Sequence, residues 1–353
     1  MDYSLRCLDC NKLFDSNYNK QKCNACNGLL EVEYKKFNFK IKMQNNFWNY
    51  EKILPKSNYR YYEIGGTKLI KSNEYKNLFL KLEIQNPTNS FKDRGSVVEI
   101  AKAIEYGYDE VVCASTGNMA YSISYFAKLN KIKSRIFISN NANKDKINYI
   151  RSTHDANITQ IRGDFTDAQK LAEQYALRHN VFLTGDYCYR KEGQKTMIYE
   201  IMSNIKPDYV LVPIGNATLI SGILKGLNEM KTMRIINNFP IIVGIEAQLC
   251  NPLEKAFNSQ KAIKYQKPMT KADAIAVGYP TFGESVINEL RKKSGFIISV
   301  TENEMKKEQK AFHEDYGLIC ELAGAASIAA FKKLRLENKK NKKIITIISG
   351  GNI

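Results

Sequence analysis

A single lysine stands where a turn passes into a helical pattern. The stretch NPTNSFKDRG, residues 86–95, places Lys92 between an aromatic residue and the charged pair Asp93–Arg94. Its first five residues favour turns and helix caps, and apolar residues at helical spacing follow it. An amine that is partly desolvated in such a position can have its pKa lowered, so that it acts as a nucleophile and a base. On these residues alone, a solvated first helical turn capped by Ser90 is an equally good interpretation.

Three loops rich in small and turn-forming residues come directly after β-rich runs. They are residues 115–118 (STGN), 214–222 (IGNATLISG) and 349–352 (SGGN). In an open α/β sheet, ligands bind at the carboxyl ends of the strands, where such loops lie. The sequence contains neither the GxGxxG nor the GxxxxGK[ST] pattern, which argues against a dinucleotide or a nucleoside triphosphate.

The second of these loops has the composition of a phosphate site. Small side chains at the start of a predicted helix leave backbone N–H groups at its positive end. The predicted phosphate-binding residues are Gly215, Asn216, Ala217, Thr218 and Leu219. Ser349 ends a predicted buried strand and offers a neutral hydroxyl, and Lys92 offers a reactive amine. A phosphate cradle, a reactive lysine and a hydroxyl acceptor together indicate a pyridoxal 5'-phosphate site.

Four cysteines near the N-terminus have the spacing of a metal ribbon. CLDC and CNAC each place two thiolates on one tight turn, and four thiolates suit tetrahedral zinc. The predicted ligands are Cys7, Cys10, Cys23 and Cys26. Because no coordination position would remain open, we expect a structural zinc. Free or disulfide-paired cysteines are the alternative, and disulfides are uncommon in a cytoplasmic chain.

Length and composition limit the class of protein. A chain of 353 residues with 44% hydrophobic residues predicts two packed domains and a small appendage. We find no run of 18 apolar residues and no apolar signal-peptide core, so we expect no membrane association and a cytoplasmic location. The net charge of +17 allows a nucleic-acid partner. The basic residues are mostly lysines spread over the whole chain, however, so we expect no nucleic-acid partner and a preference for anionic substrates.

Strand and helix patterns alternate from about residue 66 onward, which predicts parallel sheets with right-handed crossovers. Seven stretches of this alternation resemble a known family in type and order. They are GGTKLI (65–70), NPTNSFKDRG (86–95), STGN (115–118), YRKEGQKT (189–196), VPIGNATLISG (212–222), CELAGAASIAA (320–330) and SGGN (349–352). Together they resemble the fold type II, or tryptophan-synthase-like, pyridoxal phosphate enzymes, and within them the threonine synthase family. The ribbon resembles the N-terminus of many threonine synthases.

The resemblance implies two open, mostly parallel twisted sheets flanked by helices. The implied domains are a zinc ribbon at 1–34, a large cofactor-binding domain at 35–108 and 191–353, and a small α/β domain at 109–190. We also expect a homodimer.

Residue roles follow from the resemblance by motif. Lys92 would bind the cofactor covalently and then move protons, the loop of residues 215–219 would hold its phosphate, and Ser349 would face its pyridine nitrogen. The remaining implied contacts are Asn118 to the cofactor's 3-hydroxyl, Ser115, Thr116 and Asn118 to the substrate carboxylate, and Arg190 to the leaving group of a phosphorylated substrate. The residues alone allow blander interpretations: Asn118 as a helix cap, Ser349 as a buried hydroxyl, and Arg190 as an exposed charge on a loop.

The implied reaction is that of a lyase in threonine biosynthesis, which converts O-phosphohomoserine and water to threonine and phosphate. Two motifs depart from the family. GNATL replaces a loop in which Gly-Asn is usually repeated, and SGGN replaces the usual TGHG. Both changes resemble dehydratases, so a serine/threonine dehydratase or a cysteate-synthase-like replacement on O-phosphoserine is the alternative. A zinc-ribbon nucleic-acid-binding protein on a degenerate enzyme fold is the third hypothesis, and the intact Lys92 argues against it.

Overall fold

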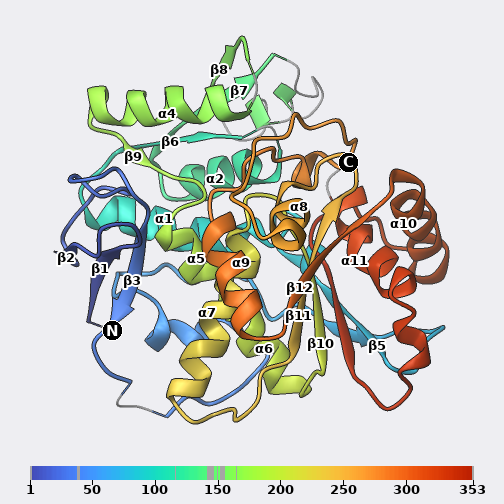
Figure 1. Ribbon diagram of the computed structural model, residues 1–353. Helices are drawn as coiled ribbons and strands as arrows, with labels where there is room; N and C mark the ends of the chain where they lie inside the picture. Colours follow the sequence, from blue (N-terminus) through green and yellow to red (C-terminus); the bar gives the residue numbers. More distant parts are fainter. Residues whose placement is uncertain are drawn as a thin grey trace. The chain divides into compact units, whose positions relative to one another are not determined.

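The computed structural model describes residues 2–37, 40–115, 117–140, 147–148, 150–151, 156–163 and 165–351 (Figure 1). Contacts within the chain divide it into two compact units. Unit 1 comprises Met1–Ile41, Trp48–Glu63 and Lys92–Gln194, and unit 2 comprises Lys42–Phe47, Ile64–Phe91 and Lys195–Ile353. No helix in the described part of the chain is long and apolar enough to cross a membrane.

The N-terminal part of unit 1 is a small antiparallel sheet. Its strands lie in the order β2-β1-β3 and span Tyr3–Cys7 (β1), Leu13–Asp15 (β2) and Leu30–Tyr34 (β3). Side chains alternate along β1, so that every second residue from Tyr3 to Cys7 is buried. We call residues 2–34 the ribbon.

The rest of unit 1 is built on a parallel sheet in the order β8-β7-β6-β9. The strands are β6 (Glu110–Ala114), β7 (Lys133–Ser139), β8 (Asn157–Ile161) and β9 (Phe182–Leu183). The helices are α1 (Lys92–Glu105), α2 (Asn118–Leu129), α4 (Phe165–His179) and α5 (Cys188–Gln194). Alternate residues of β6 face opposite sides of the sheet, and Val112 and Ala114 form one cluster with the alanines of α4.

Unit 2 is built on a larger sheet in the order β12-β11-β10-β13-β5-β4. The strands are β4 (Leu69–Lys71), β5 (Leu78–Leu82), β10 (Tyr209–Pro213), β11 (Ile241–Ala247), β12 (Phe296–Val300) and β13 (Ile344–Ile348). All neighbours pair in parallel except the edge strand β4, which runs antiparallel to β5. The central strand β13 is buried at every residue, as expected for a strand covered on both faces.

Six helices accompany this sheet. They are α6 (Thr196–Asn204), α7 (Thr218–Thr232), α8 (Pro252–Ser259), α9 (Gly283–Lys292), α10 (Glu302–Tyr316) and α11 (Leu322–Lys333). Helix α11 is rich in alanine, and its small side chains lie in the core cluster of the sheet. A Cβ atom at Gly324 would approach the carbonyl oxygen of Gly350 to 3.1 Å, so the small residues of CELAGAASIAA permit close packing.

The predicted class of two open, mostly parallel sheets flanked by helices is therefore confirmed. The contact units and the domain ranges expected from the sequence differ in several places: the segment from residue 35 to Ile41 and residues 48–63 and 191–194, all expected in the large domain, fall in unit 1. The expected ranges put residues 92–108 in the large domain, whereas helix α1 packs on α5 and α2 of unit 1. The boundary falls between Phe91 and Lys92, in the middle of the NPTNSFKDRG stretch.

Candidate functional site

The loops predicted to bind a ligand follow three neighbouring strands of unit 2. Strand β13 pairs in parallel with β10 on one side and with β5 on the other. Residues 215–219 follow β10, Ser349 follows β13, and residues 86–91 follow β5 after a short 3-10 helix. Because parallel strands end at the same edge, these three loops lie at one carboxyl edge of the sheet, where ligands bind in open α/β sheets.

The loop before Lys92 is joined by backbone hydrogen bonds to the segment after β13. The N–H of Phe91 donates to the carbonyl oxygen of Ser349 (3.1 Å), and the N–H of Gly351 donates to that of Asn89 (2.8 Å). Ser90 and Gly350 form an antiparallel bridge between these two contacts. Lys92 is the next residue along the chain and begins α1. The structure thus places Ser349 opposite the residues that lead directly to the candidate lysine.

Ser90 does not act as the helix cap that the simpler interpretation requires. Its hydroxyl oxygen is buried and has no hydrogen-bond partner among the described residues. A buried hydroxyl without a partner costs free energy, and functional sites are a common reason for one. The orphaned hydroxyl therefore fits a loop that receives a polar group from a bound molecule.

The predicted phosphate loop has the backbone that its sequence requires. Ala217 occupies the N-cap position of α7 in the left-handed conformation (φ 63°), and no side chain caps this helix. A Cβ atom at Gly215 would lie 2.7 Å from the carbonyl oxygen of Ala274, so only glycine fits there. A helix of this length presents partial positive charge and backbone N–H groups at its start. These residues fit an anionic group such as a phosphate ester.

Asn216 differs from the other residues of this loop. Its side-chain oxygen accepts hydrogen bonds from the N–H (3.2 Å) and the hydroxyl (3.1 Å) of Thr281. The N–H of Phe282 donates to the Asn216 carbonyl oxygen (3.2 Å). The side chain therefore fixes the segment before α9. We therefore expect the predicted contact of Asn216 with a phosphate to come from its backbone N–H.

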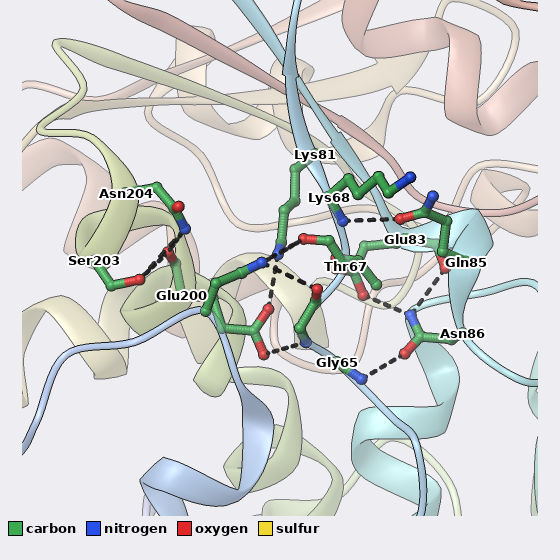
Figure 2. Close-up of polar contacts among 12 residues, drawn as sticks. Gly65, Thr67, Lys68, Lys81, Glu83, Gln85, Asn86, Glu200, Ser203 and Asn204 are labelled. Atoms are coloured by element: carbon green, nitrogen blue, oxygen red, sulfur yellow. Dashed lines mark hydrogen bonds and ion pairs between the residues drawn. The ribbon is translucent and has the colours of Figure 1, made fainter.

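A buried polar network holds the GGTKLI turn and the start of the NPTNSFKDRG loop, both in unit 2 (Figure 2). The Glu83 carboxylate accepts from the hydroxyl of Thr67 (2.7 Å) and from the side-chain amide of Asn86 (2.9 Å). The Asn86 side-chain oxygen accepts from the N–H of Gly65 (2.9 Å). Each end of the network lies on a different loop, so it fixes their relative position.

The same network contains a lysine without exposure to solvent. The Lys81 amine donates to Glu200 (2.7 Å), to the Thr67 carbonyl oxygen (2.7 Å) and to the side-chain oxygen of Asn45 (3.1 Å) (Figure 2). The other Glu200 oxygen accepts from the N–H of Gly66 (2.9 Å). Both charges are fully buried, and the three donor positions of the amine are used, which is the condition for tolerating such a pair.

In unit 1, the start of α1 is tied to α2. The Asp93 carboxylate accepts from the hydroxyl of Ser122 (2.6 Å), which also lies 2.7 Å from the hydroxyl of Ser96. The Ser96 hydroxyl in turn donates to the carbonyl oxygen of Lys92 (3.1 Å). Helix α2 follows the loop of residues 115–118, so this chain of hydroxyls connects Lys92 to the element that bears Asn118.

Ser115, Gly117 and Asn118 follow the carboxyl end of β6, a strand that lies between β7 and β9 in its sheet. Ser115 and Asn118 are buried, and the Ser115 hydroxyl accepts from the N–H of Gly117 (3.2 Å). Gly117 occupies the N-cap position of α2, and Asn118 is the first helical residue, so Asn118 is not the cap. The other predicted substrate contact, Thr116, lies outside the described residues.

Arg190 is not an exposed charge on a loop, and that interpretation is wrong. It belongs to helix α5 and is fully buried. Its guanidinium donates to the carbonyl oxygens of Gly185 (3.0 Å) and Lys92 (3.2 Å). It also donates to the hydroxyl of Ser96 (3.2 Å) and forms an ion pair with Glu99. These partners occupy the guanidinium, so they favour a positioning role over the predicted contact with a leaving group.

Glu99 was not predicted as part of the site. It is fully buried in α1, pairs with Arg190 and accepts from the N–H of Gly185 (2.7 Å). Burial raises its pKa from its ordinary value near 4.5 to about 7, although the charge of Arg190 opposes this shift. One signal in the sequence could have indicated its burial: Glu99 stands within SVVEIAKAI, among residues of the apolar face of the helix. Sequence alone did not reveal the partner, which is 91 residues away.

The four predicted metal ligands are brought together at one end of the ribbon. The sulfur atoms of Cys7, Cys10, Cys23 and Cys26 all lie within 4.8 Å of one another. The structure joins none of these four cysteines in a disulfide. With metal–sulfur bonds of about 2.3 Å, a tetrahedral zinc needs sulfur atoms on the order of 4 Å apart. The cluster therefore fits zinc, and the N–H of Ala25 donates to the Cys23 sulfur (3.4 Å) as a second layer of support.

Comparison with known proteins gives matches over most of the chain. The family described as "Pyridoxal-phosphate dependent enzyme" matches residues 61–350. The threonine synthase of Methanosarcina acetivorans is 33% identical over 353 residues, which cover 94% of this chain and 87% of that protein. The threonine synthase of Methanocaldococcus jannaschii is 32% identical and covers 98% of this chain and 91% of that protein.

Solved structures share the fold at lower identity. Maize serine racemase aligns with a TM-score of 0.71 at 23% identity, over 81% of this chain and 88% of that one. The processed form of threonine deaminase isoform 2 from Solanum lycopersicum aligns with a TM-score of 0.71 at 22% identity, over 81% of this chain and 84% of that one. At these identities the likeness supports the arrangement of strands and helices, and it does not distinguish one reaction from another.

Proposed function

The chain belongs to the family of pyridoxal-phosphate dependent enzymes and is a pyridoxal-phosphate-dependent lyase, and from this premise we propose that it acts as a threonine synthase. The proposed reaction converts O-phosphohomoserine and water into threonine and phosphate. The relatives named threonine synthase, at 32% and 33% identity over nearly the whole chain, support this choice of substrate.

The observation that carries the proposal is the shared edge of three parallel strands. The candidate phosphate loop, Ser349 and the loop leading to Lys92 follow β10, β13 and β5, which are neighbours in one sheet. A phosphate cradle, a hydroxyl for a ring nitrogen and a reactive amine are the groups that pyridoxal phosphate requires. When bound, this cofactor supplies an electron sink for the carbanions formed during elimination and replacement.

The roles proposed for the protein residues are those that the family resemblance implies for their motifs. Backbone N–H groups at the start of α7 bind the phosphate, and the Ser349 hydroxyl accepts or donates a hydrogen bond at the ring nitrogen. A neutral hydroxyl does not hold that nitrogen protonated as a carboxylate would, which suits elimination and replacement over transamination. Lys92 binds the cofactor and moves protons at its Nζ atom. Ser115, Thr116 and Asn118 bind the substrate carboxylate, and Asn118 also contacts the cofactor's 3-hydroxyl.

Binding of the cofactor is tested before the reaction. Purified protein is incubated with pyridoxal phosphate and reduced with borohydride, and the modified peptide is identified by mass spectrometry. We expect the label on Lys92 and a yellow protein before reduction. The variant Lys92→Ala should remain folded and lose the label at this position. Labelling at other lysines with equal efficiency in both proteins would overturn the proposed cofactor site.

A substrate panel then tests the reaction. We expect phosphate and threonine from O-phosphohomoserine, at rates well above the release of 2-oxo acid from threonine or serine. Release of oxo acid alone would show that the loops GNATL and SGGN mark a dehydratase. Consumption of O-phosphoserine in preference to O-phosphohomoserine would support the cysteate-synthase-like alternative instead. A homodimer and a cytoplasmic location stay predictions that this panel does not address.

A further inference from the structure

Helices α5 and α1 pack so closely that a side chain cannot be added at either of two glycines between them. A Cβ atom at Gly193 would lie 1.9 Å from the carbonyl oxygen of Arg94, and one at Gly95 would lie 2.5 Å from the Cγ atom of Arg190. Two glycines thus let the helix backbones approach closely. The hydrogen bond from Arg190 to the Lys92 carbonyl oxygen joins α5 to the first residue of α1.

The opposite side of α5 is held by the ribbon. The hydroxyl of Tyr34 donates to Glu192, and Lys191 forms an ion pair with Glu31. Two further contacts join α5 to the ribbon: the hydroxyls of Tyr189 and Tyr3 lie 3.1 Å apart, and the Cys188 thiol lies 3.6 Å from the side-chain oxygen of Gln21. Four of the five residues 188–192 therefore contact the ribbon, and the fifth, Arg190, contacts α1.

A second cluster joins the ribbon to the last turn of α1. The Lys102 amine is buried among the rings of Tyr3, Tyr106 and Tyr189, at 5.3, 4.6 and 5.5 Å from their centroids. The hydroxyl of Tyr106 donates to the carbonyl oxygen of Ser16 in the ribbon (2.6 Å). A cation surrounded by aromatic faces away from solvent is a strong and directional contact. The ribbon is thus fixed to both helices that determine where Lys92 lies.

The strands that make these contacts are set by the cysteine cluster. Strand β1 carries Tyr3 at one end and Cys7 at the other, and β3 begins four residues after Cys26 and carries Glu31 and Tyr34. Elsewhere the ribbon packs less closely: a cavity of about 500 Å³ lies between residues 18–27 and the segment around α4 and β9. The ribbon is also joined to α4 by a partly exposed ion pair of Lys22 and Glu173 (2.7 Å), so its buried attachments are those to α1 and α5.

We propose that the ribbon is a positioning element for Lys92, which acts through α5 and Arg190. Metal at the four cysteines fixes β1 and β3, these strands fix α5, and Arg190 fixes the backbone from which the reactive amine extends. This inference rests on the proposed function to the extent that Lys92 is the reactive lysine. It assigns the ribbon a part in the chemistry, beyond stabilising its own end of the chain.

The test uses residues of one strand that point to different partners. Glu31→Gln and Tyr34→Phe remove contacts with α5, whereas Glu33→Gln on the same strand removes a pair with Arg6 inside the ribbon. Each variant is assayed for bound zinc, melting temperature and the rate at which pyridoxal phosphate and borohydride label Lys92 across pH. Phosphate release from O-phosphohomoserine is measured in parallel, with kcat and KM separated.

We expect the double variant Glu31→Gln/Tyr34→Phe to keep its zinc and to label Lys92 at least tenfold more slowly, with an altered pH profile. Its kcat should fall more than its KM changes, and Arg190→Lys should behave in the same way. Glu33→Gln should stay within twofold of the unmodified protein. Equal labelling rates in the double variant and in Glu33→Gln would overturn the inference, as would a slow rate that follows the melting temperature alone. Absence of labelling at Lys92 in the unmodified protein would instead refute the proposed function.

Discussion

The guanidinium of Arg190 donates a hydrogen bond to the backbone carbonyl oxygen of Lys92, across 98 residues of sequence. Its counter-ion, Glu99, lies two turns further along the same helix that Lys92 begins. One arginine therefore fixes the start of α1 through the backbone and its middle through an ion pair. The candidate lysine is therefore held through its main chain, at the carbonyl oxygen that accepts from Arg190.

The raised pKa of Glu99 predicts how stability depends on pH. The folded protein holds this proton more tightly than the unfolded chain does. The stabilisation is thus complete below about pH 4.5 and is lost as pH rises through about 7. Each pKa unit corresponds to about 1.4 kcal/mol, so the free energy of unfolding should fall by on the order of 3 kcal/mol over this range, relative to Glu99→Gln. Chemical denaturation at several pH values measures the difference. The exposed substitution Glu314→Gln should follow the unmodified protein, and parallel pH curves for Glu99→Gln and Glu314→Gln would contradict the prediction.

Close packing of α5 on α1 predicts that replacing Gly193 by alanine destabilises the protein. In an ordinary helix Gly→Ala is favourable by about 1 kcal/mol, but at Gly193 the new methyl group would meet the backbone of Arg94 at 1.9 Å. We expect Gly193→Ala to lower the free energy of unfolding by roughly 3 kcal/mol, the upper part of the usual overpacking range. Gly317→Ala is the control, because its φ of +63° carries strain of about 1 kcal/mol and nothing lies within 4 Å. A smaller loss at Gly193 than at Gly317, measured by urea denaturation, would show that the helices separate easily.

The buried ion pair of Lys81 and Glu200 predicts that a second substitution restores stability lost through the first. Lys81→Met leaves the Glu200 carboxylate buried without its cation, which typically costs about 3–5 kcal/mol. The double variant Lys81→Met/Glu200→Gln removes both charges and keeps an acceptor for the N–H of Gly66, so it should recover most of this loss. Thermal unfolding of both variants measures the recovery. Lys342→Met, which breaks an exposed pair with Asp208, should destabilise the protein far less than Lys81→Met. If the double variant is no more stable than Lys81→Met, the unpaired Glu200 charge does not cause the loss of stability in Lys81→Met.

The phosphate loop predicts a position where glycine is well tolerated. Ala217 has a φ of 63°, and the left-handed conformation costs an L-residue about 1 kcal/mol relative to glycine. Ala217→Gly removes this strain while it adds freedom to the unfolded chain, so we expect a change of less than about 1 kcal/mol in either direction. In contrast, Ala311→Gly within α10 should destabilise by about 1 kcal/mol. Equilibrium unfolding of the two variants compares them, and a larger loss at residue 217 than at residue 311 is the contrary result.

The cysteine cluster predicts one zinc per chain and a change in thiol reactivity on metal removal. The other four cysteines are buried, and burial raises the pKa of the thiols of Cys113 and Cys320 to about 12 and that of Cys250 to about 11. Thiolates are the reactive species, so a thiol reagent should modify almost no cysteine rapidly while metal is bound. After chelation four should react rapidly, and Cys10→Ser should lower the metal content. Rapid reaction of four thiols in protein that retains its metal would argue against the site.

Patterns of short range predicted much of this structure. The CxxC spacing located the ribbon, and the alternation of strand and helix patterns indicated parallel sheets. The loops at 215–219 and 349–351 and the loop before Lys92 were recognisable because small and turn-forming residues followed apolar runs. These signals are local, since each arises within a single turn or strand.

The ion pairs between residues far apart in the chain could not be predicted from the sequence. Lys81 and Glu200 are 119 residues apart, and a lone charge in a strand or helix is ordinarily a solvated one. The short, polar stretch YRKEGQKT is typical of a loop, but tertiary contacts keep Arg190 in a helix with no exposure to solvent. The unit boundary at Phe91 and Lys92 was equally hidden, because the alternation of elements continues across it.

Strand β13 is the last of the six strands of its sheet to be synthesised, yet it lies between β10 and β5. On the ribosome, unit 1 can complete its own sheet before β13 emerges, whereas the larger sheet must remain divided until then. The backbone of Ser349 that secures the loop before Lys92 arrives with this strand. Nascent chains interrupted before residue 344 should therefore lack the backbone contact that holds the loop before Lys92 in its final place.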